Sequence, residues 1–111
     1  MFAAITSLYL VAAPVLLPLQ LPAPEVTEAQ KWARETGYVA GAAKFCEFDQ
    51  DLIESFISRA YAKLAETAVD KEDLIVARIE FSNIMSTATT KAPSDGCEDF
   101  KETFRRESAR L

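Results

Sequence analysis

The residues with the clearest potential for covalent chemistry are two cysteines, Cys46 and Cys97, which lie 51 positions apart. A redox centre needs two cysteines close together, usually as Cys-x-x-Cys, and a lowered thiol pKa. A widely spaced pair in a small exported domain is instead typical of a structural disulfide, whereas in the cytosol it would be two free core thiols. We predict a Cys46–Cys97 bridge, for which the chain-entropy model gives about 4 kcal/mol of stabilisation.

Acid–base and nucleophilic catalysis have few suitable groups in this chain. It contains no histidine, so neither a Ser-His-Asp triad nor a histidine general base can be assembled. It also lacks a glycine-rich phosphate-binding motif and clustered metal ligands. We therefore predict a protein that is not an enzyme and that uses no cofactor and no metal.

Six carboxylates flank the two cysteines, and a disulfide would gather them at one end of the molecule. They are Glu47, Asp49, Asp51, Asp95, Glu98 and Asp99. Such a cluster could bind calcium or a basic partner, but the Asp-x-Asp-x-Asp-Gly pattern of calcium loops is absent. The pattern favours capping of the N-termini of the second and fourth helices.

Residues 1–24 contain no ionisable side chain, and Glu25 is the first charged residue. A stretch of this kind is either a secretory signal peptide or a membrane anchor. The signal interpretation lacks a basic start, and the anchor interpretation is weakened by Pro14, Pro18 and Pro22, which remove backbone hydrogen bonds in lipid. A cleaved signal is favoured over an uncleaved anchor and over the N-terminal arm of a cytoplasmic protein. We predict a periplasmic or otherwise secreted protein, with membrane anchoring as the alternative.

The net charge of −5 at neutral pH lies entirely after Pro24. Binding to nucleic acid requires a basic face that displaces counterions from phosphates. The basic cluster of Arg105, Arg106 and Arg110 is interleaved with glutamates and is placed to complement the C-terminal end of a helix. Nucleic acid is therefore not an expected partner, and membrane contact is expected only through residues 1–24 if they are uncleaved.

Apolar residues recur at helical spacing in four segments, and no segment alternates as a strand does. We predict an all-α fold, a small four-helix bundle closed by one disulfide, formed by residues 25–111 as one domain. The first helix should begin at Thr27, which forms a capping box with Gln30, and run to about Phe45.

The later helices should start after Asp49, after Asp70 and after the loop 91–96. The second and third helices are joined by a short linker, so we predict an antiparallel hairpin whose free ends lie together. Cys46 precedes this hairpin and Cys97 follows it. The bridge would therefore join the end of the first helix to the start of the fourth.

Two further patterns concern packing inside the bundle. Gly37 and Gly41 lie four residues apart in the first helix, where glycine costs up to about 1 kcal/mol against alanine. We predict that they allow another backbone to approach closely. A single core should contain aromatic residues from all three later helices, namely Phe56 and Tyr61 from the second, Phe81 from the third and Phe104 from the fourth.

The third helix is unusually poor in charge, with only Arg78 and Glu80 between Leu74 and Thr90. Those two residues could mark a polar ligand pocket, although Arg78 is more simply a flanking residue that reaches solvent. A helix this uncharged should be covered on more than one side, either at the centre of the bundle or at a contact with a partner. The possible interaction surface consists of its uncharged outer positions: Ser82, Asn83, Ser86 and Thr87.

The cysteine frame resembles that of the periplasmic acid-stress chaperones of Gram-negative bacteria. Cys46 and Cys97 bracket a helical hairpin, and the run from Cys97 to Phe100, Cys-Glu-Asp-Phe, is similar to a cysteine-centred run in that family. In this chain the run follows the second cysteine and not the first. The resemblance implies a small helical fold that opens at low pH and binds unfolded proteins through apolar surface, and it assigns no individual site residue.

The absence of catalytic groups favours a non-enzymatic protein that binds another envelope protein. One alternative is an acid-activated chaperone, since the chain has 17 carboxylates and no histidine. A second alternative is a carrier of a small apolar ligand inside the bundle.

Overall fold

The structure is a computed structural model that describes residues 25–111, which form four α-helices. The helices are α1 (Glu28–Phe45), α2 (Gln50–Thr67), α3 (Lys71–Ala88) and α4 (Gly96–Ala109). This part of the chain contains no strand, which confirms the all-α helical bundle. The signal or anchor predicted for residues 1–24 lies outside the described residues. None of the four helices is long and apolar enough to cross a membrane.

Three helix starts lie where the capping residues predict them. The Thr27 hydroxyl accepts a hydrogen bond from the Gln30 backbone N–H, and the Gln30 side chain accepts one in return from the Thr27 N–H. The Asp49 carboxylate accepts a hydrogen bond from the Asp51 N–H at 2.9 Å, and the Asp70 carboxylate accepts one from the Asp73 N–H at 2.8 Å. Each bond satisfies a backbone donor that the first helical turn leaves free.

The fourth helix starts without a side-chain cap. Of the acidic residues expected to serve its N-terminus, Asp95 makes no side-chain hydrogen bond to the first turn, whereas Glu98 and Asp99 lie within that turn, where the helix dipole favours negative charge. The Asp95 backbone ψ of 4° differs from the extended conformation in which a capping side chain reaches back over the turn. The chain enters α4 instead through Gly96, whose φ of 80° is readily adopted by glycine.

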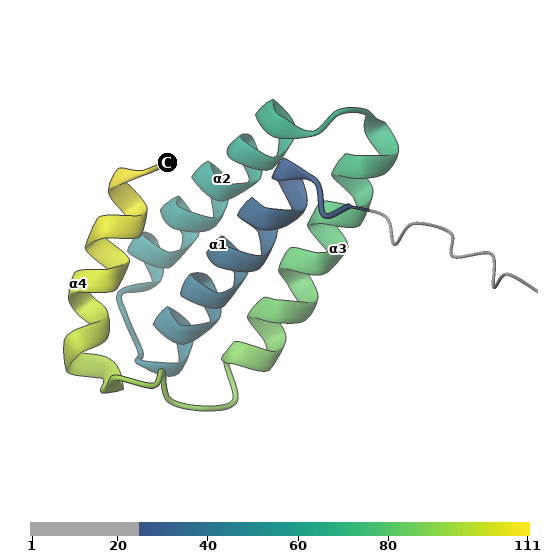
Figure 1. The fold of residues 1–111 in the computed structure, drawn as a ribbon. Coiled ribbons are helices and arrows are strands. Elements are labelled where there is room, and N and C mark those ends of the chain that lie inside the picture. Colours follow the sequence, from purple (N-terminus) through teal and green to yellow (C-terminus); the bar gives the residue numbers. More distant parts are fainter. Residues whose placement is uncertain (1–24) are drawn as a thin grey trace, which may run out of the picture.

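The central helix of the bundle is α1, which packs against all three other helices. Figure 1 shows α3 and α4 on opposite sides of it. Of the two positions predicted for the third helix, the centre of the bundle is therefore wrong, and a contact with a partner stays a prediction. The reason is side-chain size: the buried surface of α1 consists largely of small residues, so three neighbours can approach it. They include Ala29, Ala33, Gly37, Ala40, Gly41, Ala42 and Ala43.

The predicted hairpin of α2 and α3 is present only in part. The two helices run antiparallel and are joined by a short linker, but α1 lies between them along most of their length (Figure 1). The start of α2 and the end of α3 still lie at the same end of the bundle. At that end Cys46 and Cys97 form the predicted disulfide, with their Cα atoms 5.5 Å apart, and join the end of α1 to the start of α4.

The backbones of α1 and α3 approach closely at the two glycines, as predicted. A Cβ atom on Gly37 would lie 2.8 Å from the carbonyl oxygen of Phe81. A Cβ atom on Gly41 would lie 2.6 Å from the Cβ of Ala88 and would also overlap the carbonyl oxygen of Met85. These distances are too short for non-bonded contact, so the observed spacing of α1 and α3 requires glycine at both positions.

One buried carboxylate joins the two helices at the other end of their contact. Asp73 is 7% exposed. Its carboxylate accepts a hydrogen bond from the Thr27 hydroxyl at 2.7 Å and another from the Val69 N–H at 3.0 Å. A buried charge is tolerated when its oxygens are hydrogen-bonded in this way. Asp73 therefore fixes the start of α1 to the start of α3.

The predicted aromatic residues belong to one core. Phe56 and Phe81 are fully buried, and Tyr61 packs edge-on against Phe81 with ring centroids 5.0 Å apart. The ring centroids of Phe104 on α4 and Phe56 on α2 lie 5.2 Å apart. The ring of Phe48, in the loop after α1, packs at the same distance on the Phe104 ring. Aromatic contacts therefore hold α4 against the rest of the bundle.

We expect Gly41→Ala to lower the free energy of unfolding by about 1 to 3 kcal/mol, because the new methyl group must push α3 away from α1. Alanine is the better helix former by up to about 1 kcal/mol, so a loss can arise only from the helix contact. Urea denaturation measures it. Ser58→Ala, at an exposed position of α2, is the control and should be neutral or slightly stabilising. A stabilised Gly41→Ala protein would contradict the close contact.

We expect Cys46→Ser or Cys97→Ser to lower the free energy of unfolding by about 2 to 5 kcal/mol, because the unfolded chain loses its constraint. The double variant should cost no more than the worse single variant, since one bridge is lost in each case. Chemical denaturation measures the change. Thiol labelling of the denatured wild-type protein should find no free thiol, and two reactive thiols would contradict the disulfide.

Candidate interaction surface

One side of α3 faces away from the rest of the bundle. Ala77, Phe81 and Ala88 are buried against α1, so positions half a turn away point outward. We call these outward positions the α3 outer face, and all of them are exposed. The α3 outer face consists of Ile75, Val76, Ile79, Ser82, Asn83, Ser86 and Thr87.

The N-terminal half of the α3 outer face is apolar. Ile75 is 57% exposed, Val76 is 43% exposed and Ile79 is 56% exposed. A single exposed apolar side chain is ordinary on a protein surface, but three within little more than one helical turn form a patch, and such patches mark contact sites. This patch is the strongest indication of a binding surface in the described part of the chain.

The C-terminal half of the face carries the four residues that the sequence singled out. Ser82, Asn83, Ser86 and Thr87 are all exposed. The Thr87 hydroxyl donates to the backbone carbonyl of Asn83 at 3.0 Å, within the helix. This half is therefore uncharged, lined by small polar groups, and continuous with the apolar half.

The sequence interpretation did not include the apolar half of the face. Its signal was present: Ile75, Val76 and Ile79 lie off the inner stripe of α3 that Ala77 and Phe81 define. A helix that is apolar on two sides is usually buried on both, so its second side is expected to pack against another element or protein. The low charge of α3 was correctly recognised as unusual, and the structure associates it with an exposed face.

The two charged residues of the middle of α3 do not form a common polar site. The Glu80 carboxylate accepts a hydrogen bond from Nε of Arg34 on α1. The Arg78 guanidinium lies 5.8 Å from the centre of the Tyr61 ring on α2. Each residue thus has its own partner on a different neighbouring helix, which gives no support to a polar ligand pocket built from the pair.

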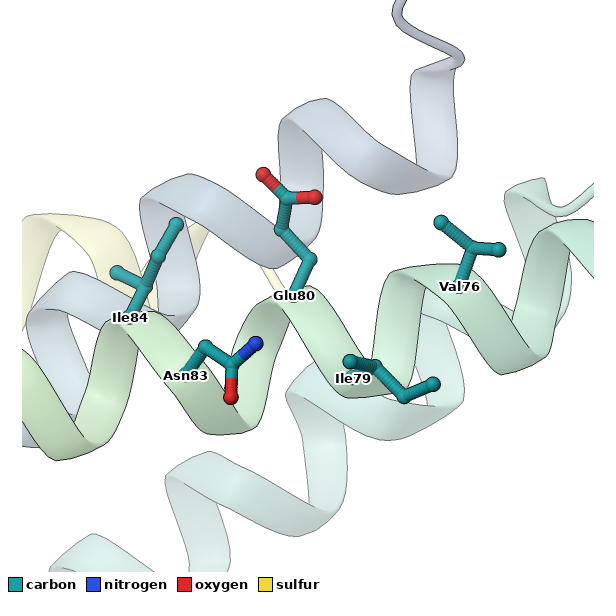
Figure 2. A pocket seen from close by; sticks show the side chains of 5 residues that line it. All are labelled: Val76, Ile79, Glu80, Asn83 and Ile84. Carbon is teal, nitrogen blue, oxygen red and sulfur yellow. The ribbon is translucent and has the colours of Figure 1, made fainter.

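A shallow hollow of about 330 Å³ runs along one edge of the α3 outer face. Figure 2 shows that all the residues lining it belong to α3, with Glu80 rising towards α1. They are Val76, Ile79, Glu80, Asn83 and Ile84. Because a single helix forms the hollow, it suits the side chains of a docked protein better than an enclosed small molecule.

The acidic end beside the disulfide consists of separate local arrangements. Asp49 caps α2, and Glu98 pairs with Lys101 at 3.0 Å. Across residues 25–111, no three histidine, cysteine or acidic side chains are placed to hold a metal ion together. The structure gives no support to the calcium-site alternative for these carboxylates.

The arginines at the C-terminal end of α4 pair with glutamates of α4 and of α1. Arg110 donates to Glu35 of α1 at 3.2 Å and to Glu107 at 2.7 Å. Its guanidinium also lies 4.7 Å from the centre of the Trp32 ring, a distance at which cation and ring attract. Within α4, Arg105 donates two hydrogen bonds to the Glu102 carboxylate, and this pairing lowers the pKa of that carboxyl below its usual value.

No protein-family model, curated protein or solved structure matches this chain. The resemblance to the acid-stress chaperones therefore stays a prediction that rests on the cysteine frame. The α3 outer face is identified as the candidate interaction surface by the exposure and the helical positions of its residues alone.

Proposed function

We propose that this protein is a small exported helical protein, without enzymatic activity, that binds another protein of the cell envelope through the α3 outer face. The observation that carries the proposal is the apolar patch of Ile75, Val76 and Ile79 on a well-packed helix. Exposed apolar area of this kind contributes to affinity at about 25 cal/mol per Å² removed from water, before the costs of association.

The framework behind the patch supports a binding role. Gly37 and Gly41 hold α3 against α1, and Asp73 fixes the start of α3 to Thr27. A surface on a helix held at several points loses little conformational freedom when a partner docks. The disulfide favours an oxidising compartment as the place where the protein works.

An acid-activated chaperone is the second candidate, and the attachment of α4 favours it. Phe100 and Phe104 of α4 cover an aromatic cluster that includes Phe48. The far end of α4 is held by the ion pairs of Arg110 with Glu35 and Glu107. Exposed ion pairs of this kind contribute little on their own, so this candidate requires that the excess positive charge at low pH also opens the Phe56–Phe104 contact. The disulfide would keep the other end of α4 attached.

The carrier of a small apolar ligand receives no specific support. Large side chains such as Phe56, Leu64 and Phe81 fill the interior and are fully buried. The hollow on α3 is open to solvent and is formed by one helix.

The proposed function predicts that position 79 contacts the partner in the cell. A photo-crosslinking amino acid in place of Ile79 should give an adduct with a second envelope protein, because this side chain is exposed in the middle of the patch. Mass spectrometry identifies the adduct. The control is the same amino acid at Leu52 of α2, whose 55% exposure matches the 56% of Ile79 without belonging to the α3 outer face. Equal adducts at both positions, or none at position 79, would contradict the proposal.

The chaperone alternative predicts a defined pH dependence. The chain has no histidine, so stability should be flat between about pH 5.5 and 8. Glu102 has a lowered pKa in the folded protein, so its contribution is present above the unfolded pKa and is lost as pH falls through the folded value. Full protonation of the carboxylates would leave the 12 lysines and arginines unbalanced, which favours opening below about pH 4.

Circular dichroism from about pH 8 down to pH 2, together with a client-aggregation assay at each pH, tests this alternative. A chaperone should suppress client aggregation only in the acidic range, with the disulfide intact. A protein that stays folded and inert towards clients at about pH 2 to 3 would exclude the chaperone and leave the envelope binding protein.

A further inference from the structure

The exposed apolar surface of residues 25–111 gathers where the chain joins residues 1–24. Eight large hydrophobic side chains are exposed in this part of the chain, and five of them lie on α3 or in the two segments that are hydrogen-bonded to its start. They are Val26, Val69, Ile75, Val76 and Ile79. The apolar half of the α3 outer face therefore continues to the point at which residues 1–24 are attached.

A buried carboxylate holds that point of attachment in place. Asp73 accepts hydrogen bonds from the Thr27 hydroxyl at 2.7 Å and from the Val69 N–H at 3.0 Å. The chain that enters α1 is thus held at the start of α3, and Figure 1 shows it leaving α1 towards α3 and away from α4. Residues 1–24 are consequently attached beside the apolar half of the α3 outer face.

The segment and the face match in chemistry. Residues 1–24 contain no ionisable side chain, and the α3 outer face contains none either. Contact between them would bury no charge, and the apolar area removed from water contributes about 25 cal/mol per Å². The part of the segment nearest to the bundle is rich in leucine: Leu16, Leu17, Leu19 and Leu21.

The segment is also long enough to cover the face. Ile79 follows Asp73 by six positions, which is about 9 Å along a helix, and Thr87 follows it by 14, about 21 Å. Even at the small rise of a helix, 24 residues span about 36 Å. The four leucines lie six to eleven positions before Thr27, so they are within reach of Ile79.

The charges around the apolar half of the face disfavour a lipid surface as its occupant. Glu25, Glu28, Asp70 and Glu72 are exposed at this end of the bundle, and one lysine, Lys71, lies among them. Anionic membrane surfaces attract clusters of lysine and arginine, so this mainly acidic border opposes their approach. An uncharged segment of the same chain meets no such repulsion.

We propose that residues 1–24, as long as they are attached, pack on the apolar half of the α3 outer face and exclude the partner from it. The inference rests on the proposed function, because the excluded partner is the protein that binds this face. A tethered segment acts at an effective concentration of about millimolar, so a weak contact is enough to hold off a free partner. Removal of the segment, as expected for a cleaved signal, then frees the face.

Photo-crosslinking within the full chain tests the contact. Residues 1–111 carry a photo-crosslinking amino acid in place of Ile79, and the oxidised protein is irradiated at about 1 μM to keep adducts between molecules rare. Trypsin releases residues 1–31 as one peptide, because Lys31 is the first basic residue. Mass spectrometry should find this peptide joined to position 79 through residues 1–24. The control at Leu52, which is equally exposed, should give at least about tenfold less of the adduct.

Variants of the segment test the exclusion. Leu17→Glu combined with Leu19→Glu should reduce the adduct within the chain at least about fivefold, because the contact would bury two carboxylates against isoleucine. Thr6→Glu combined with Ser7→Glu adds the same charge at polar positions and should leave the adduct unchanged. In an envelope extract, position 79 of the leucine variant should form more adduct with a second protein than the wild-type full chain does. Circular dichroism checks that both variants fold.

Three results would overturn the inference: no adduct between position 79 and residues 1–24, equal adducts at positions 79 and 52, or an adduct that the leucine variant leaves unchanged. Equal capture of the second protein by the leucine variant and the wild-type full chain would remove the exclusion.

The failure of this inference is distinguishable from the failure of the proposed function. If position 79 crosslinks to another envelope protein in the cell but never to residues 1–24, the proposed function stands and the inference is removed. If the adduct within the chain forms and the leucine variant abolishes it, but no second protein is captured in any form, the contact is supported and the proposed function is removed.

Discussion

The close contact of α1 with α3 at Gly37 and Gly41 is the constraint on which the rest of the molecule depends. The α1 backbone at these glycines lies directly against the backbone carbonyls of Phe81 and Met85 and the side chain of Ala88 on α3. No layer of large side chains separates the two helices there. The inner side of α3 therefore needs only a few large residues, chiefly Phe81, to complete the contact. Isoleucine and valine are then left on the outer side, where they are exposed. The same glycines that make α1 central thus account for the apolar surface.

Local signals predicted the helix starts well. The capping box at Thr27 and the carboxylates of Asp49 and Asp70 act within one helical turn of themselves, so short-range rules describe them. The disulfide was predictable from the wide spacing of the two cysteines and from the path of the chain. Asp95 makes no cap because its backbone ψ of 4° departs from the extended conformation of a capping residue.

The central position of α1 and the exposure of the patch were not predictable in the same way. Charge indicated that α3 should be covered, whereas the volumes of the side chains decide which helix lies in the middle. α1 carries charged residues such as Lys31, Arg34 and Lys44 on its exposed side, and the remainder of its surface is small enough to accept three neighbours. Ile75, Val76 and Ile79 lie off the inner stripe of α3, so the sequence shows a second apolar side of the helix. Periodicity does not say what lies against that side.

The contacts that hold α4 lie on one side of α1 and the α3 outer face lies on the other, so a change on one side does not act directly on the other. The disulfide, the Phe48–Phe104 contact and the Arg110 ion pairs all act between α4 and the α1–α2 side of the bundle. α3 lies across α1 from them (Figure 1). A reducing agent, or a fusion partner attached after Leu111, would therefore act first on the α4 flank and not directly on the α3 outer face.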